Sequence, residues 1–246
     1  MENRSRDMML NQKQNQLGFT WHYQVPEINP QGIERACFRV QKLFPEYVWN
    51  TVYLEDNPFT FPEVQTVLEG ITVGGHKLAD QQQVLNQSNS LKRLLKLIKQ
   101  KTFCLDKSTF CELHSLVAFE EALEWGVFRT TSEVKIAGTE HHPPPAEQLD
   151  RIFHNGLAYL NSLSNPLEQA MALFLFGSQH QFFHDGNKRT SRLMMNGILL
   201  SNGLDAMTIP AKQKLAFNQT MISFYDNHQA DEMMTFLVSL INENNR

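Results

Sequence analysis

The stretch Gln181-Phe-Phe-His-Asp-Gly-Asn-Lys-Arg-Thr-Ser-Arg192 carries the strongest structural signal in the chain. An apolar helix is expected to run up to about His180, and Asp185-Gly186-Asn187 has the composition of a sharp turn. A second helix is expected to begin at Lys188. Because glycine and asparagine tolerate unusual backbone angles and leave backbone N–H groups uncovered, this stretch predicts two helices joined by a tight turn, with an open N-terminus on the second.

That helix N-terminus is suited to binding an anion. Free N–H groups and the partial positive charge of a helix N-terminus attract negative charge. Arg189 and Arg192 are three residues apart and so lie on one helix face, and their planar guanidinium groups match phosphate oxygens. Asp185 beside them is a natural ligand for a Mg²⁺ ion that bridges phosphates. A di- or triphosphate fits these residues best; the alternative is an ordinary turn followed by a solvated basic helix face.

The rest of the chain predicts mainly helices. Between the helical segments, residues 127–145 hold a short β-like alternation at Val134, Lys135 and Ile136, followed by a triple proline at 143–145 that cannot lie inside a helix. These features predict an all-α bundle with one short β-hairpin. The helices expected from apolar spacing and capping residues lie at 33–43, 61–70, 81–101 and about 106–126, and again from 146 to the end of the sequence.

Length and composition exclude several classes of protein. The chain has 246 residues, a formal net charge of −4 and a pI near 6.1, so it lacks the basic field of a non-specific nucleic-acid binder. No apolar run reaches the roughly 18 residues needed to span a bilayer, and the polar first residues lack the apolar core of a signal peptide. The three cysteines form no metal-like pair and indicate reduced thiols. We therefore expect a cytoplasmic protein without nucleic-acid or membrane partners; a homo-oligomer is compatible with the sequence.

The quoted stretch resembles the signature of the Fic (filamentation induced by cAMP) or Fido family, His-Pro-Phe-x-Asp-Gly-Asn-Gly/Lys-Arg-x-x-Arg. The resemblance covers roughly residues 105–242. It includes Leu113-His114, Gly126-Val-Phe-Arg129 with the triple proline, and Ile209-Pro210. It implies a Fic-fold helical bundle with a β-hairpin flap, in which residues 105–246 form the Fic core domain and residues 1–104 an N-terminal helical region.

The resemblance also implies an activity: AMPylation, the transfer of AMP from ATP to a hydroxyl group of a target protein, with Mg²⁺ as cofactor. The family's functional residues carry over to this chain by position. They are Asp185 for Mg²⁺; Gly186, Asn187, Lys188 and Arg189 as an anion cradle; Arg192 near the γ-phosphate; and Val134, Lys135 and Ile136 as the flap that binds the main chain of the target by β-augmentation.

One position departs from the family signature. The catalytic histidine, the general base that deprotonates the target hydroxyl, falls on Gln181. Glutamine has no titratable group, and losing a positioned base lowers a rate by about 10²–10⁴-fold. In the alignment with the signature, His180 comes one residue before the histidine position and His184 stands at the variable position. Neither can replace the base without a shift of the alignment, since one residue turns a helical side chain by about 100°. An extra loop residue could bring His180 into register, whereas His184 could be an ordinary loop side chain.

This departure leaves three functions open. The first is a protein AMP-transferase with undetectable or very weak activity. The second is a catalytically degenerate module that binds a nucleotide or a partner protein. The third is an enzyme that transfers a different phosphate-linked group.

A segment upstream of the core resembles the family's inhibitory helix, [Ser/Thr]-x-x-x-Glu-Gly/Asn, whose glutamate pairs with the second arginine and blocks the γ-phosphate. This segment is Thr66-Val-Leu-Glu69-Gly70, in the helix predicted at 61–70. The spacing is imperfect because Gln65, rather than Thr66, stands four residues before Glu69. The resemblance implies that Glu69 reaches Arg192; the alternative is a surface glutamate at a helix C-terminus.

Overall fold

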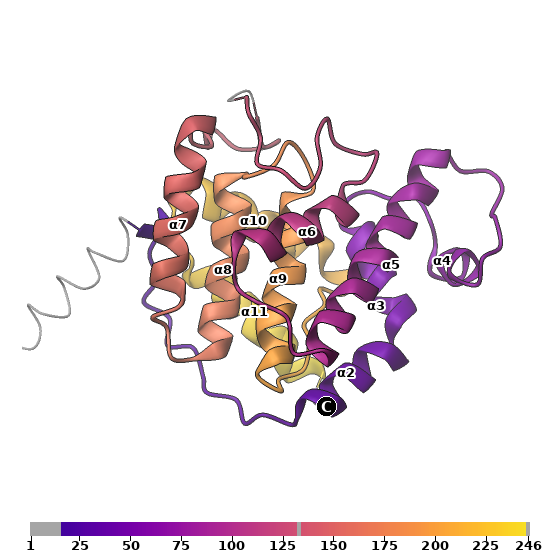
Figure 1. Ribbon diagram of the computed structural model, residues 1–246, viewed down its shortest axis with the longest axis horizontal. Helices are drawn as coiled ribbons and strands as arrows, with labels where there is room; N and C mark the ends of the chain where they lie inside the picture. The colour runs from indigo at the N-terminus through magenta and orange to yellow at the C-terminus, as the bar shows by residue number, and fades with distance from the viewer. Residues whose placement is uncertain (1–15, 132–133, 245–246) are drawn as a thin grey trace, which may run out of the picture.

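A computed structural model describes residues 16–131 and 134–244 of the chain. Its regular elements are helices, so the all-α prediction is confirmed. Figure 1 shows α8 (Pro166–His180) and α9 (Asn187–Ser201) near the centre of the molecule, with other helices around them and the loops of residues 118–131 and 134–145 across one end. Among the described residues, no helix is both long and apolar enough to cross a bilayer.

The helices follow the chain in two groups. We call residues 127–145 the flap segment. Before it the helices are α2 (Ile33–Lys42), α3 (Phe44–Tyr53), α4 (Phe61–Leu68), α5 (Leu78–Lys99) and α6 (Lys107–Val117). After it they are α7 (Leu149–Leu160), α8 (Pro166–His180), α9 (Asn187–Ser201), α10 (Lys214–Asn227) and α11 (Asp231–Asn244), with single 3₁₀ turns at Ala146–Gln148 and Ala211–Gln213.

Helices α8 and α9 form the core and fix the place of the turn between them. The N-terminus of α8 is capped by Asn165, whose side chain accepts hydrogen bonds from the N–H groups of Leu167 and Glu168, and the helix is buried almost all round. It packs on α9 at a point where Gly177 faces Ser191. A Cβ atom at residue 177 would lie 2.1 Å from Ser191 Oγ, so a larger residue there would force the Ser191 side chain to move.

Phenylalanine rings hold the α8–α9 turn against α6 and α7. The ring of Phe110 on α6 lies 5.9 Å from that of Phe182 and 4.9 Å from that of Phe183, centre to centre. Phe153 on α7 stacks on Phe110 at 5.3 Å. Phe182 and Phe183, the two rings that belong to the turn, are fully buried. Aromatic contacts of this kind add to the energy of area burial, and they keep the turn on the core side of the molecule.

Two helix predictions need correction. The helix expected at about 106–126 ends at Val117, because residues 118–125 form turns and Glu120 takes a left-handed conformation with φ of 59°. No helix was expected between residues 43 and 61, yet α3 follows α2 directly, with Pro45 in its first turn. Both differences matter for the site, since each places a carboxylate there.

The expected β-hairpin is absent from the described part of residues 127–145; Ser132 and Glu133 lie outside the described residues. An isolated two-stranded hairpin is marginally stable in water, and here the backbone pairs with other segments instead. The N–H of Arg129 donates to the carbonyl of Phe182 at 2.9 Å, and His141 Nε2 bonds the carbonyl of Gln179 at 2.9 Å. The flap segment is therefore attached near both of its ends, at Arg129 to the α8–α9 turn and at His141 to the last turn of α8.

We predict that Gly177→Ala destabilises the protein by about 1–2 kcal/mol, because the new methyl group overlaps Ser191 and overpacking of this size outweighs the gain in helix propensity. Chemical denaturation would measure the change. Gly74→Ala is the matched control, since nothing lies within 4 Å of a Cβ there. Combining Gly177→Ala with Ser191→Ala should recover part of the loss. A Gly177→Ala protein as stable as the parent would show that the close approach is not required.

Candidate functional site

The α8–α9 turn is shaped by two left-handed residues and one side chain. Gln181 ends α8 with φ of 47°, and Gly186 precedes α9 with φ of 73°. Directly after Gly186, Asn187 accepts a hydrogen bond from the N–H of Phe183 at 2.9 Å and donates to the carbonyl of Phe183 at 2.8 Å. The turn is thus held from inside, and the start of α9 stays uncovered.

His114 on α6 supports the turn from below. Its Nδ1 accepts from the N–H of Gly126 at 2.9 Å, so its Nε2 carries the proton and donates to the carbonyl of Asp185 at 2.9 Å. Its ring stacks on that of Phe183 at 3.6 Å. Burial lowers the pKa of His114 to about 4, so the ring is neutral at pH 7. The sequence analysis matched this histidine to the family without assigning it a role.

Arg129 ties the start of the flap segment to the same turn. Its side chain is 2% exposed, and its Nε donates to the carbonyl of Gln181 at 2.6 Å. The two terminal nitrogens donate to the carbonyls of Thr131 at 2.7 Å and Pro144 at 2.5 Å. One buried guanidinium therefore joins both ends of the flap segment to the residue at the family's histidine position.

A cavity of about 200 Å³ opens above the turn. It brings together the predicted anion cradle, Asp185, Gln181 and two of the three predicted flap residues; Val134 and Arg192 do not line it. Its walls are Glu55, Lys135, Ile136, Ala137, Gln181, Asp185, Gly186, Asn187, Lys188, Arg189 and Tyr225.

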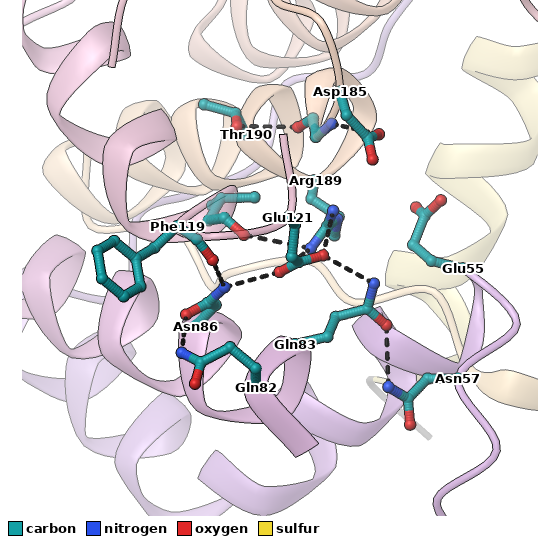
Figure 2. A network of polar contacts seen from close by, with 12 residues as sticks. Glu55, Asn57, Gln82, Gln83, Asn86, Phe119, Glu121, Asp185, Arg189 and Thr190 are labelled. Carbon is teal, nitrogen blue, oxygen red and sulfur yellow. Dashed lines mark hydrogen bonds and ion pairs between the residues drawn. The ribbon is translucent and has the colours of Figure 1, made fainter. Parts of the chain in front are cut away.

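Both predicted arginines are buried and paired with carboxylates. Arg189 is 3% exposed and contacts Glu121, with Nη1 donating to Oε1 at 3.1 Å and Nη2 lying 2.9 Å from Oε2 (Figure 2). Arg192 is 7% exposed, and its Nη2 donates to Glu55 Oε1 at 3.0 Å. The other oxygen of Glu55 lies 3.3 Å from Lys188 Nζ. Glu55 therefore bridges two cations of the α9 N-terminus.

The charge of Glu55 is strongly favoured in this position. Burial alone would raise the pKa of its carboxyl group, but the positive charges of Lys188, Arg192 and Arg189 outweigh burial and lower the pKa to about 2. Glu55 is consequently ionised at pH 7. A carboxylate thus occupies the region where the sequence analysis expected a phosphate.

The expected contact between Glu69 and Arg192 is not made. Glu69 caps the end of α4, where its side chain is exposed, and Glu55 is the partner of Arg192 instead. The sequence contained a signal for the role of Glu55. Thr51 stands four residues before Glu55, as the inhibitory pattern requires, whereas Thr66 stands only three residues before Glu69. The next residue, Asp56, has φ of 61°, a conformation that the pattern's Gly or Asn adopts with less strain.

Gln181 faces the cavity, as the alignment with the family signature requires. Its Nε2 donates to the carbonyl of Ser178 at 2.6 Å, and its Oε1 accepts from Asn187 Nδ2 at 3.0 Å. His180 points the other way and is buried, with Nε2 3.0 Å from the carbonyl of Leu17. Burial lowers its pKa to about 4. His180 is therefore not brought into register by an extra loop residue.

His184 also lies away from the cavity. Its Nε2 is 3.5 Å from Glu124 Oε2, and its side chain is 11% exposed. It is not among the residues that line the space above the turn. The structure thus places neither flanking histidine at the position of the family's base.

Asp185 fits a magnesium ion only together with a phosphate ligand. Its Oδ1 accepts from the N–H of Gly186 at 2.6 Å, and the residue lines the cavity. Over residues 16–131 and 134–244, no group of three or more His, Cys, Asp or Glu side chains could hold a metal. Mg²⁺ usually takes one or two carboxylates, several waters and substrate phosphates, so one protein carboxylate is the donor set it needs.

Comparisons with known proteins agree with this geometry. Residues 104–199 match the model of the Fic/DOC family. A relative named "Protein adenylyltransferase Fic" from Drosophila grimshawi is 31% identical over 176 residues, which are 69% of this chain and 35% of that protein. The chain thus spans about a third of the length of this curated relative.

Two solved structures share the fold. Fic-1 from C. elegans superposes with a TM-score of 0.72 at 18% identity, covering 96% of this chain and 68% of that one. A Fic domain containing signaling protein from Bacteroides thetaiotaomicron superposes with a TM-score of 0.70 at 19% identity, covering 95% and 92%. The matched motif, the helical architecture and these relatives lead to one assignment: the chain belongs to the Fic/DOC family, whose model matches residues 104–199.

Proposed function

We propose that this chain binds a nucleoside triphosphate with Mg²⁺ at the N-terminus of α9, and that it is a protein AMP-transferase whose transfer step is slow. The observation that carries the proposal is the bridge from Glu55 to Lys188 and Arg192. It places one negative charge on two cations beside a helix N-terminus, which is the position a terminal phosphate would take. The relatives named protein adenylyltransferase support ATP as the nucleotide.

The phosphates would contact backbone and side-chain groups that are already in place. Gly186 and Asn187 present the N-terminus of α9, and Arg189 and Lys188 line the same cavity. Asp185 would hold Mg²⁺, which neutralises phosphate oxygens when bound. Because Asn187, His114 and the phenylalanine rings hold the turn, little reorganisation would accompany binding.

Glu55 would act as the inhibitory residue that the sequence analysis assigned to Glu69. Its carboxylate and a terminal phosphate would compete for Arg192 and Lys188, since both ligands are anions and the cavity is small. Movement of the loop after α3 would free the arginine. We therefore assign autoinhibition to Glu55.

Gln181 would slow the transfer step and leave binding intact. Its amide cannot accept the proton of a target hydroxyl, and both ends of that amide already bond Ser178 and Asn187. Lys135 and Ile136 at the cavity wall, with the adjoining Val134, would bind the main chain of the target protein. The second candidate function, a nucleotide-binding module without transfer, is favoured by the same two hydrogen bonds of Gln181.

We predict that Glu55→Gly binds Mg·ATP about tenfold to a hundredfold more tightly than the parent, since removing a competing charge pair is worth about 1–3 kcal/mol. Isothermal titration calorimetry measures the change. Glu69→Gly is the matched control: it loses the same carboxylate from an exposed position and should leave the affinity unchanged. A gain of affinity in the Glu69 variant alone would return the inhibitory role to that residue.

Transfer is expected to need two changes together. We predict no detectable or very weak self-labelling by the parent protein with labelled ATP and Mg²⁺, and a gain of about 10²–10⁴-fold when Gln181→His is combined with Glu55→Gly. Gln181→Ala with Glu55→Gly is the control and should bind ATP without labelling. Strong labelling by the unmodified protein would mean that another group is the base, and His180→Ala and His184→Ala would then be compared.

A further inference from the structure

The two arginines of the site meet their carboxylates in different ways. Arg189 directs the end of its guanidinium group to Glu121, through Nη1 and Nη2. Its Nη1 also donates to the carbonyl of Val117 at 3.3 Å. A guanidinium has five N–H groups; these contacts use three of them. The remaining two, on Nε and Nη2, lie along one edge of the planar group and form no hydrogen bond with the residues that the structure describes.

We propose that Glu121 is a positioning residue that holds Arg189 with this open edge available to a phosphate. The proposal rests on the proposed function, because it presupposes a phosphate ligand in the cavity that Arg189 lines. An arginine edge of this kind binds two phosphate oxygens in parallel. Phosphate and Glu121 can therefore contact Arg189 at the same time, and Glu121 need not leave.

The surroundings of Glu121 fix its carboxylate on both sides. Asn86 Nδ2 donates to Oε1 at 2.8 Å, and Gln83 Nε2 donates to Oε2 at 3.0 Å. Figure 2 shows the carboxylate enclosed between these α5 amides and Arg189. Asn86 is held in turn by the carbonyl of Phe119 at 2.7 Å. Each oxygen of Glu121 thus has an amide donor besides the arginine, and moving it would leave buried polar groups unpaired.

Glu55 lacks such support. Its carboxylate contacts only Arg192 and Lys188 among the described residues, and it stands outside the network of Figure 2. The Nε and Nη1 atoms of Arg192 are buried without a hydrogen-bond partner in the described part of the chain. The pKa values differ in direction: burial lowers that of Arg192, whereas Glu121, Glu55 and Asp185 together outweigh burial and raise that of Arg189. The Glu55 carboxylate is therefore suited to give up its place on Arg192 to an anionic ligand, whereas the Glu121 carboxylate is suited to remain bound to Arg189.

This difference gives the two carboxylates opposite effects on anion binding. By charge alone, removing either one should strengthen the binding of a polyphosphate, because a negative charge is lost near the site. If Glu121 orients Arg189, its loss should weaken binding despite that electrostatic gain. The sign of the change therefore separates a positioning residue from a second competing charge.

The test is made in the Glu55→Gly protein, with inorganic tripolyphosphate and Mg·ATP as probes in calorimetry. We expect Glu121→Gln to weaken both affinities by about tenfold to a hundredfold, as for loss of one oriented arginine contact of about 1.4–2.8 kcal/mol. Glu121→Asp should recover part of the affinity. Glu120→Gln is the charge-matched control, since Glu120 is exposed and should leave both affinities unchanged. Equal or tighter binding by Glu121→Gln would overturn the proposal.

A second readout tests the orientation without any nucleotide. The Nε–H signal of Arg189 in ¹⁵N NMR should be distinct and slowly exchanging in the parent, and should move towards the free-arginine position in a folded Glu121→Gln protein. An unchanged signal would overturn the positioning role. Failure of the Glu55→Gly protein to bind tripolyphosphate would instead refute the proposed function, which the NMR result does not depend on.

Discussion

The balance of charge at the N-terminus of α9 is the constraint on which the rest of the site depends. A helix N-terminus carries partial positive charge and disfavours cations, yet three cations lie in the first turns of α9, and two are almost fully buried. Buried charges persist only when they are paired. The carboxylates that balance Lys188, Arg189 and Arg192 come from three separate loops, after α3, α6 and α8: Glu55, Glu121 and Asp185.

The loops that carry these groups include strained backbone. Among the described residues, three of the five non-glycine residues with positive φ stand next to, or within, the groups that complete the site: Asp56, Glu120 and Gln181; the other two are Lys101 and His228. A left-handed residue of this kind costs about 1–2 kcal/mol. Such strain persists where the surrounding contacts over-determine the conformation. Here the ion pairs of Glu55 and Glu121 and the hydrogen bonds of Gln181 offset it, so the loops keep their shapes although they lie outside regular structure.

The sequence predicted the parts of the site that are continuous in the chain. The two helices, the turn between them and the cation-rich start of α9 all follow from local propensity within residues 166–192, and the structure has them where they were expected. Glu121 could not be found in this way, because its role arises from contacts with Gln83, Asn86 and Arg189 that are distant in sequence. Glu55 could have been predicted from the sequence, since its spacing from Thr51 meets the inhibitory pattern.

Gln181 shows that the architecture of the site and the chemistry expected of it have different requirements. The turn depends on the backbone carbonyl of Gln181, which accepts from Arg129, and on the side chain of Asn187. Neither contact needs a titratable group at position 181, so glutamine preserves the cradle and the flap attachment while it removes the proton acceptor. Positioning and proton transfer lower a barrier through separate contributions. Under the proposed function, a complete phosphate cradle would therefore be compatible with a transfer step slower by several orders of magnitude, and the residue at position 181 would separate binding from transfer.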